Sequence, residues 1–292
     1  MTSSKNNTLF RLPSDRILIW TLRFCALIAG TIALLIVSFL IIEAIPVIRH
    51  MGIARFFTDA DWHPTEGLFN LLPMLWGTRF AMAGSVLVTT PLGILSPMFC
   101  HYYAPPIVAK GYRQLIQLLA GIPSVVYGFW GLVVLVPLIG RIRPPGPSLV
   151  AGVVILTIMI LPTIALTADA AFANVPQQYL RGAAALGLSR WGIIKGVVFP
   201  SAKSGLFTGV LLETGRAIGE TMAILMVCGN VVQTPKSLFE PIRTLTANIA
   251  LEMSYALGDH RSALFVSGLV LMAFIVALVA AAESMSRKGI YE

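Results

Sequence analysis

The sequence predicts an all-α integral membrane protein with six transmembrane helices. Of its 292 residues, 57% are hydrophobic and only 12% are charged, and the mean hydropathy is +0.82. A soluble domain of this size would carry far more charge. The apolar residues gather in separate runs of about 20, which is the length of a helix that crosses a bilayer and about twice that of a strand in a membrane barrel.

Charge and cysteine patterns exclude several classes of function. The net charge of +8 is spread over short loops without a basic run or an aromatic platform, so no nucleic acid is expected as a partner. The cysteines and histidines are dispersed along the chain, so neither a disulfide framework nor a metal site is predicted. The residues concerned are Cys25, Cys100, Cys228, His50, His63, His101 and His260.

The first 75 residues are expected to form a tail, one helix and a loop. Residues 1–16 are polar and basic and are predicted to be a cytoplasmic tail. The apolar stretch from Phe24 to Ile42 is too long for the core of a cleaved signal peptide, so residues 17–45 are predicted to remain as the first transmembrane helix. Residues 46–75 include the turn-rich segment FFTDADWHPTEG and are predicted to form a periplasmic loop.

Residues 76–284 are expected to form a core of five further helices. Pro123 is expected to bend the second of these and so to expose backbone groups that a cavity or a neighbouring helix can satisfy. A periplasmic loop with a short amphipathic helix is predicted at 233–262, and a cytoplasmic tail at 285–292. The predicted spans are about Trp76–Tyr103, Leu115–Ile139, Leu149–Ala171, Lys203–Val232 and Ala263–Ala282.

Residues 172–202, before the fifth span, have the pattern of two short helices. Asn174 is predicted to cap the first helix and Gly187 to end it, while Ser189 caps a second helix that ends before Pro200. Two interpretations of this loop are open. It is either a docking platform for a partner protein or a pair of interfacial helices lying on anionic membrane lipid.

The distribution of lysine and arginine sets the expected orientation. With six spans both termini lie on one side of the membrane, and the short loops on that side hold most of the basic residues. The positive-inside rule then predicts that both termini are cytoplasmic. The expected location is the bacterial inner membrane, as a multi-pass protein.

Three ionisable residues lie near the middle of the fifth span. Glu213, Arg216 and Glu220 are three and four residues apart, which places them on one helix face with Arg216 between two carboxylates. An ion at bilayer depth costs about 2.5–3.5 kcal/mol, so these groups are expected to face protein or a watery path. The alternative is a neutralised network that only locks helices together. Close approach of another helix is expected at the glycine repeat Gly205, Gly209, Gly215 and Gly219.

The loop at 172–202 resembles the EAA loop of binding-protein-dependent ABC importer permeases, because GAAALG is followed by Pro200 within VVFP. The resemblance implies the type I importer (MetI-like) permease fold and a coupling helix that docks on an ATPase. Gly187 and Pro200 fall on the glycine and proline of the motif, and Ala183 lies in its alanine run. The family's leading glutamate falls on Arg181, or on Gly182, so no specific salt bridge to the ATPase is expected.

Within that family the chain resembles the PstC-type phosphate permeases. Three segments carry the resemblance: FFTDADWHP, LAGIPSVVYGFWG and GRAIGETMA, the last of which contains Arg216 and Glu220. The resemblance implies a PstA-type second permease, a cytoplasmic ATPase dimer that binds ATP and Mg, and a periplasmic or lipid-anchored phosphate-binding protein. No cofactor is expected on this chain, since it lacks a phosphate-binding P-loop pattern.

These observations lead to a hypothesis for transport. Arg216 offers a planar fork of donors to inorganic phosphate, and Glu213 and Glu220 compensate its charge when the path is empty. The side chains of Ser124, Tyr127 and Thr221 either add neutral hydrogen bonds along the path or serve helix packing.

Several alternatives to phosphate import are open at this point. The substrate can be a related oxyanion such as sulfate, molybdate or phosphonate. An ion-coupled secondary carrier is disfavoured, because the first three spans show no evident repeat in the last three. An enzyme is not expected, because no nucleophile lies at a spacing that would pair with the acidic residues.

Overall fold

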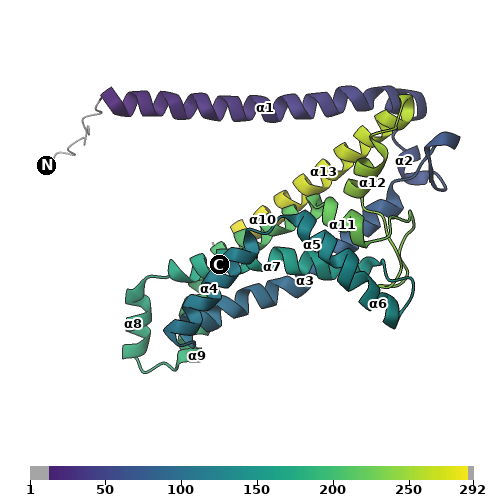
Figure 1. Ribbon diagram of the computed structural model, residues 1–292. Coiled ribbons are helices and arrows are strands. Elements are labelled where there is room, and N and C mark those ends of the chain that lie inside the picture. Colours follow the sequence, from purple (N-terminus) through teal and green to yellow (C-terminus); the bar gives the residue numbers. More distant parts are fainter. Residues whose placement is uncertain (1–12, 289–292) are drawn as a thin grey trace.

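The computed structural model describes residues 13–288, with side chains described from residue 17 to residue 282. Residues 1–12 and 289–292 of the predicted tails lie outside the described part. Figure 1 shows a bundle of helices with two different ends. We call the end that carries α2 (Arg55–Thr58) and α12 (Leu245–Glu252) the hairpin end, and the end that carries α8 (Gln177–Ala185) the α8 end.

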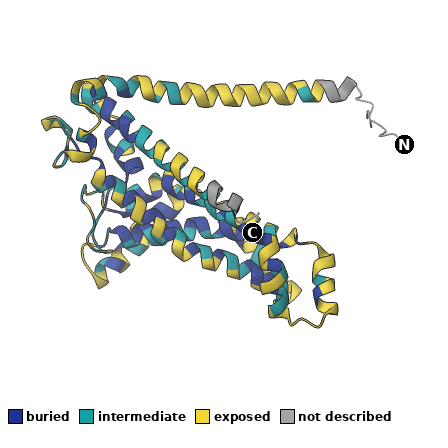
Figure 2. Cartoon of the chain, turned by 180° about the vertical axis from the view of Figure 1, so that it is seen from behind, coloured by how far each residue is buried: buried dark blue, intermediate teal, exposed yellow. Residues whose placement is uncertain are grey.

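The first helix stands away from the bundle over most of its length. α1 (Pro13–Met51) meets α13 (Gly258–Lys288) near the hairpin end, where Phe39 packs edge-on against Phe265 with ring centroids 5.5 Å apart. Arg261 and Glu43 form an ion pair of 3.8 Å at the same junction. From Ile17 to Ile36 most of the apolar side chains of α1 are exposed, as the yellow part of this helix in Figure 2 shows. A helix this apolar requires lipid or another protein around it.

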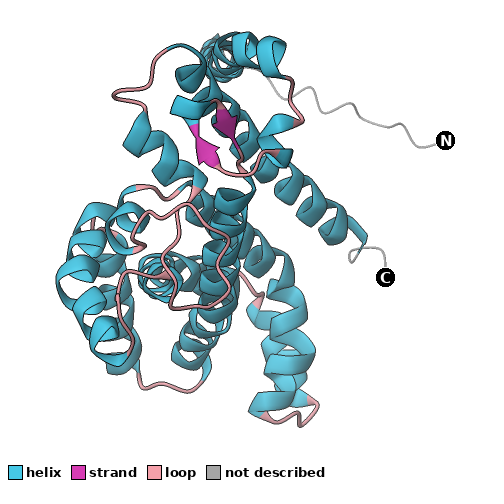
Figure 3. Cartoon of the chain, turned by 90° about the vertical axis from the view of Figure 1, so that its right-hand side faces the viewer, coloured by secondary structure: helices cyan, strands magenta, loops and turns pink. Residues whose placement is uncertain are grey.

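A small β-hairpin forms within the predicted loop 46–75. β1 (Trp62–His63) pairs antiparallel with β2 (Leu68–Phe69) around the short 3₁₀-helix η1 (Pro64–Glu66). Figure 3 shows both strands in magenta. Asp59 fixes this segment, because its carboxylate accepts hydrogen bonds from Arg55 Nε at 3.1 Å and from the Phe69 backbone N–H at 3.0 Å. The loop is shorter than predicted, since the next helix already begins at Leu72.

The centre of the bundle is built from close contacts at glycines. α3 (Leu72–Tyr102) and α7 (Leu149–Ala173) run side by side in the same direction, with Gly84 against Val153 and Gly93 against Ile164. A Cβ at either glycine would lie within 3 Å of the facing side chain. The absence of a side chain is therefore what lets these helices approach. The buried core around them includes Ile155, Leu156, Ile160, Ile218 and Ile224.

The predicted third span, about Leu115–Ile139, is wrong at its start. The chain forms a separate helix α4 (Pro106–Ala120), breaks at residues 121–123, and continues through α5 (Ser124–Trp130), a π-helical turn η2 (Gly131–Leu135) and α6 (Val136–Ile142). Pro123 lacks an N–H and disfavours helical geometry at Ile122, which explains the break. The part that is long and apolar enough to cross a membrane is Ser124–Ile142.

The loop at 172–202 holds a short helix followed by the start of a long one. Ser189 caps the second helix as predicted, because its hydroxyl accepts a hydrogen bond from the Gly192 N–H at 3.2 Å. Gly187 ends α8 in the left-handed region (φ 77°), also as predicted. The cap assigned to Asn174 is wrong: Asn174 closes α7, and Pro176 stands at the N-cap position of α8.

The second helix of this loop does not end before Pro200. α9 (Arg190–Ile193), the π-helical turn η3 (Ile194–Val198) and α10 (Phe199–Gly219) follow one another without a break. Because a proline removes one backbone donor, a π turn just before Pro200 allows the helix to continue.

The predicted fifth span, about Lys203–Val232, is interrupted. α10 ends at Gly219 and a short α11 (Met222–Val227) follows. Five described helices are long and apolar enough to cross a membrane, and the interrupted segment, which carries Lys203, Glu213 and Arg216, is not among them. The helix predicted in loop 233–262 forms as α12, but it is largely buried rather than amphipathic on a surface.

Only half of the predicted glycine stripe on α10 packs against a neighbour. A Cβ at Gly209 would lie 2.5 Å from Thr167 Oγ1 of α7, and one at Gly205 would lie 3.0 Å from the Ala171 Cβ, whereas Gly215 and Gly219 have nothing within 4 Å among the described residues. The close approach predicted for all four glycines is therefore found at two.

This contrast predicts opposite effects for two alanine substitutions. Gly209→Ala forces α10 and α7 apart and should lower the free energy of unfolding by about 1–3 kcal/mol, as overpacking does. Gly215→Ala is the matched control on the same helix and should leave stability unchanged or slightly higher, because alanine is the better helix former. Thermal unfolding of the purified chain in detergent micelles measures both, and equal behaviour of the two variants would contradict the packing.

The hairpin segment should loosen in acid through Asp59. Burial raises the pKa of Asp59, but the Phe69 N–H and the Arg55 guanidinium lower it by more, so the net pKa lies below the ordinary 3.8. A carboxyl with a depressed folded-state pKa stabilises the fold above its unfolded pKa, and this stability is lost as the pH falls through the folded pKa. Proteolysis of residues 52–70 should therefore rise below about pH 4. Asp59→Asn should show the faster cleavage already at pH 7, with a weaker response to acid.

Candidate functional site

The break between α10 and α11 is the centre of the candidate site. Glu220 has extended backbone geometry (φ −66°, ψ 126°), which turns the chain off the α10 axis. Its side-chain Oε1 accepts a hydrogen bond from the Ala223 N–H at 3.1 Å, in the first turn of α11. Its backbone carbonyl accepts a hydrogen bond from the Thr246 hydroxyl at 3.0 Å. The Glu220 side chain thus caps the first turn of α11 from the position before the N-cap residue Thr221, and its backbone is held in place by α12.

Arg216 and Glu213 form a loose ion pair on α10. The distance from Arg216 Nη1 to Glu213 Oε2 is 3.7 Å, which is too long for a hydrogen bond. The Glu213 side chain is 12% exposed, and its buried Oε2 has no hydrogen-bond partner among the described residues, while 40% of the Arg216 side chain is uncovered. The positive charge of Arg216 is therefore balanced by Glu213, while the N–H donors of its guanidinium form no hydrogen bond with that carboxylate.

The expected sandwich of Arg216 between two carboxylates is wrong. Among the described residues Glu213 is the acidic side chain that pairs with Arg216, and Glu220 turns to Ala223 instead. The physical reason is the break at Gly219, since the i, i+4 relation between Arg216 and Glu220 holds only in a continuous helix.

Two segments singled out in the sequence meet at this site. Gly128 of α5 lies against Ala223 of α11, so closely that a Cβ there would be 2.7 Å from the Ala223 Cα. The segments LAGIPSVVYGFWG and GRAIGETMA, about 90 residues apart in sequence, are therefore in contact. Both contain a helix break, at residues 121–123 and 220–221 respectively. Broken helices with free backbone groups are typical of binding sites in transporters.

The hydroxyl groups of the site are engaged in local hydrogen bonds. Tyr127 donates to the Leu119 carbonyl at 2.8 Å, across the break between α4 and α5, and Thr221 donates to the Gly219 carbonyl at 3.1 Å. Ser124 is half-buried at the start of α5. These bonds support the packing alternative for Tyr127 and Thr221, and contact of the three side chains with substrate stays a prediction.

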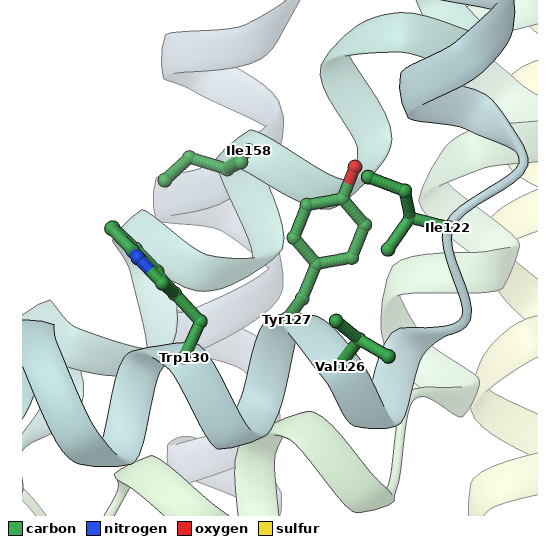
Figure 4. Close-up of a pocket in the computed structure, with 5 residues that line it drawn as sticks. All are labelled: Ile122, Val126, Tyr127, Trp130 and Ile158. Carbon is green, nitrogen blue, oxygen red and sulfur yellow. The ribbon is translucent and has the colours of Figure 1, made fainter.

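Tyr127 also lines a cavity of about 280 Å³ beside α5. Figure 4 shows its ring between Ile122 and Trp130, with Ile158 behind. Apart from the phenol the lining is hydrocarbon and indole. Such a cavity suits an apolar group and not an anion, because a buried anion requires donors or a countercharge.

The predicted coupling residues all lie near the α8 end, on α8 itself, just after it, and at the start of α10. Figure 1 shows α8 projecting from the bundle beside α9. Ala183 is buried and faces the bundle, whereas Arg181, Gly182 and Gly187 are exposed, as is Pro200 at the start of α10. The described structure shows no ion pair of Arg181. The projecting face of α8 is therefore free to meet a partner.

Sequence reasoning missed two clusters of charged residues. At the hairpin end, Glu252 bonds Trp62, Arg243 and His260. At the α8 end, Asp169 bonds Arg113 at 3.1 Å and His101 at 2.8 Å. Each cluster joins segments far apart in the sequence, so no spacing pattern could have indicated it. Within the described residues no group of three or more His, Cys, Asp or Glu side chains could hold a metal ion.

Comparison with known proteins decides the family. Residues 89–288 match the family described as "Binding-protein-dependent transport system inner membrane component". The chain belongs to this family. It is 38% identical over 274 residues to the probable ABC transporter permease protein YqgH of Bacillus subtilis, covering 90% of this chain and 89% of that protein.

Two further comparisons agree with this membership. The chain is 34% identical over 252 residues to the phosphate transport system permease protein PstC of Mesorhizobium japonicum, covering 79% of this chain and 77% of that protein. A chain of a bacterial alginate ABC transporter, solved with its pentasaccharide-bound periplasmic protein, superposes with a TM-score of 0.66 at 16% identity. That match covers 95% of this chain and 98% of that chain, and it shows that the fold is shared.

Membership confirms the predicted class and the predicted type I fold, while five of the described helices, and not the predicted six, have the length and hydropathy of a span. The chain is a multi-pass inner membrane permease subunit of an ABC importer, with the type I fold. ATP hydrolysis belongs to a separate ATPase subunit, and the substrate arrives with a binding protein. An ion-coupled carrier and an intramembrane enzyme are therefore no longer alternatives.

Two substitutions at Glu220 separate its cap from its charge. Glu220→Ala removes the acceptor of the Ala223 N–H and should cost about 1 kcal/mol in the free energy of unfolding, as the loss of a helix cap does. Glu220→Gln keeps an oxygen acceptor and should retain most of that stability. Thermal unfolding compares them, and equal losses would show that the negative charge, not the hydrogen bond, holds α11.

Proposed function

We propose that this permease subunit imports inorganic phosphate. The observation that carries the proposal is Arg216, a half-exposed guanidinium in a segment of the GRxxGET type found in PstC-type permeases, with an acidic partner too distant to occupy its donors. The relatives named as phosphate transport permeases support the same substrate. A guanidinium presents its donors in a plane that matches two oxygens of a tetrahedral anion.

The loose pair with Glu213 suits a transient contact. An unpaired cation inside the membrane is costly, so Glu213 compensates Arg216 while the path is empty. Because the pair is 3.7 Å long, an arriving oxyanion gains hydrogen bonds that the carboxylate does not already hold. Glu213 then repels the bound anion and limits its affinity, which favours release. Glu220 acts at the break and keeps Arg216 at the end of α10.

Each expected partner is assigned to one part of the molecule. A PstA-type permease pairs with this chain and covers the uncovered side of Arg216. A cytoplasmic ATPase dimer with ATP and Mg binds α8, and a periplasmic or lipid-anchored phosphate-binding protein docks at the hairpin end. Both termini are then cytoplasmic. The arrangement in Figure 1 supports this orientation, because the start of α1 and the end of α13 lie on the side of the picture that also carries α8.

A substitution of Arg216 tests the path. Arg216→Gln removes the charge but keeps some hydrogen-bonding capacity, and it should lower phosphate uptake about tenfold to a hundredfold, the value of one or two charge-assisted hydrogen bonds. Lys203→Gln is the matched control, since it removes a positive charge from the same helix far from Glu213. Uptake into proteoliposomes that hold the assembled importer and its binding protein is the measurement. Normal uptake by an assembled Arg216→Gln importer would defeat the proposal.

A related oxyanion is the competing substrate, because the YqgH relative is named only as a permease. In the same proteoliposomes, labelled phosphate should be taken up and should not be displaced by a tenfold excess of sulfate, molybdate or phosphonate. Preferential uptake of one of these ions would assign the importer to that oxyanion instead.

A further inference from the structure

The segment FFTDADWHP is typical of the phosphate permeases, yet it lies outside the proposed path. The structure buries its tryptophan: Trp62 is 3% exposed and packs edge-on against Phe69, with ring centroids 5.8 Å apart. The indole N–H donates a hydrogen bond of 2.9 Å to Glu252 Oε2, across 190 residues of sequence. A buried aromatic side chain with its polar atom on a buried carboxylate indicates a specific link and not only core packing.

Glu252 receives hydrogen bonds from three separate segments. Its side chain is 9% exposed, and besides the indole it is bonded to Arg243 Nη1 at 2.7 Å and to His260 Nε2 at 2.8 Å. Trp62 belongs to the hairpin, Arg243 to the segment just before α12, and His260 to the start of α13. Since charge-assisted bonds of this length are strong and directional, Glu252 holds these segments in one arrangement.

Arg243 and the residues on either side of it hold both ends of α11. Arg243 Nε donates to the Asn230 carbonyl at 2.8 Å, just after α11, and the Ile242 N–H donates to the Cys228 carbonyl at 2.9 Å. At the other end, Thr246 donates to the Glu220 carbonyl at 3.0 Å. A displacement of Arg243 and the first turn of α12 must therefore move α11 or break these bonds. α11 in turn begins at the break that positions the end of α10.

Asparagine and backbone contacts stiffen this connection. Arg243 Nη1 also donates to Asn248 Oδ1 at 3.0 Å, and the Leu245 N–H donates to Thr78 Oγ1 of α3 at 3.0 Å. The chain at Arg243 lies so close to α3 that a Cβ at Gly77 would be 2.7 Å from the Arg243 carbonyl oxygen. The path from the hairpin to α11 thus runs through hydrogen bonds of 2.7–3.0 Å that are buried or partly buried and lie beside α3.

We propose that Glu252 is a positioning residue for transport. Docking of the loaded binding protein on the hairpin end displaces the hairpin, and the hydrogen bond from Trp62 makes Glu252 move with it. Arg243, which is bonded both to Glu252 and to the end of α11, then displaces α11 and the helix break near Arg216. This role of Glu252 rests on the proposed function, because Arg216 matters to it only if Arg216 contacts the transported anion. Glu252 itself contacts no substrate.

The test measures coupling and not only stability. Importers with wild-type chain or Glu252→Gln are assembled with the second permease and the ATPase dimer in nanodiscs. ATP hydrolysis is measured without and with the substrate-loaded binding protein, and binding of that protein is measured separately. The Glu252→Gln importer should assemble, keep its basal rate of ATP hydrolysis and bind the binding protein. The increase in ATP hydrolysis caused by the loaded binding protein should be at least about fivefold smaller than in the wild type, since fivefold is the lower end of typical coupling between two sites.

Two further variants keep the test decisive. Glu43→Gln is the matched control, because it removes a carboxylate at the same end of the bundle whose partner, Arg261, adjoins His260. It should keep normal stimulation. Trp62→Phe removes one donor to Glu252 and keeps an aromatic ring, and it should lose part of the stimulation. If the Glu252→Gln importer fails to assemble, the stimulation of ATP hydrolysis in the Trp62→Phe importer tests the inference in its place.

Normal stimulation of Glu252→Gln, or of Trp62→Phe where the former does not assemble, would overturn the inference. An equal loss in Glu43→Gln would overturn it as well, because the effect would then belong to the whole hairpin end. Failure of the proposed function is distinguishable. A wild-type importer stimulated only by a sulfate-loaded binding protein would refute phosphate as substrate, while the comparison of the variants would still be made with that ligand.

Discussion

A positive charge inside a membrane must keep a countercharge, and this requirement shapes the centre of the protein. Arg216 meets it with Glu213 one turn earlier on α10, at a distance that balances charge without saturating the guanidinium. A tighter, bidentate pair would occupy two of the five N–H donors of the guanidinium, and a ligand would then compete with Glu213 for them. The proposed transient contact with an anion depends on this loose pair, because the guanidinium keeps donors that a ligand can use.

The scaffold around this pair is made rigid by helices that touch at glycines. α3, α7 and α10 approach one another at Gly84, Gly93 and Gly209, where even a methyl group would not fit. Next to this rigid part the chain is broken twice, at residues 121–123 and 220–221, and the segments that follow, α5 and α11, pack on each other. The proposed path therefore lies beside α5 and α11, the two segments that follow the breaks. We expect displacement of these segments to cost less free energy than displacement of the helices packed at glycines.

Local chemistry made several features predictable from the sequence. The Ser189 cap and the helix end at Gly187 depend on neighbouring residues alone, and both formed as expected. The break near Pro123 was anticipated as a bend, but its consequence, a separate α4, was not. The Asn174 cap was misplaced because α7 extends two residues beyond the predicted end, so that Asn174 serves the preceding helix.

The sequence by itself determined the class of protein, the helical architecture, and the presence of ionisable residues in the fifth segment. It could do so because hydropathy, charge and short motifs act over one or two helical turns. Only the tertiary structure decided the partners: Glu220 turns to α11, Tyr127 bonds the Leu119 carbonyl, and Glu252 gathers donors from three segments. Those choices depend on where a helix breaks and on which distant side chains meet, and no periodicity along the chain encodes either.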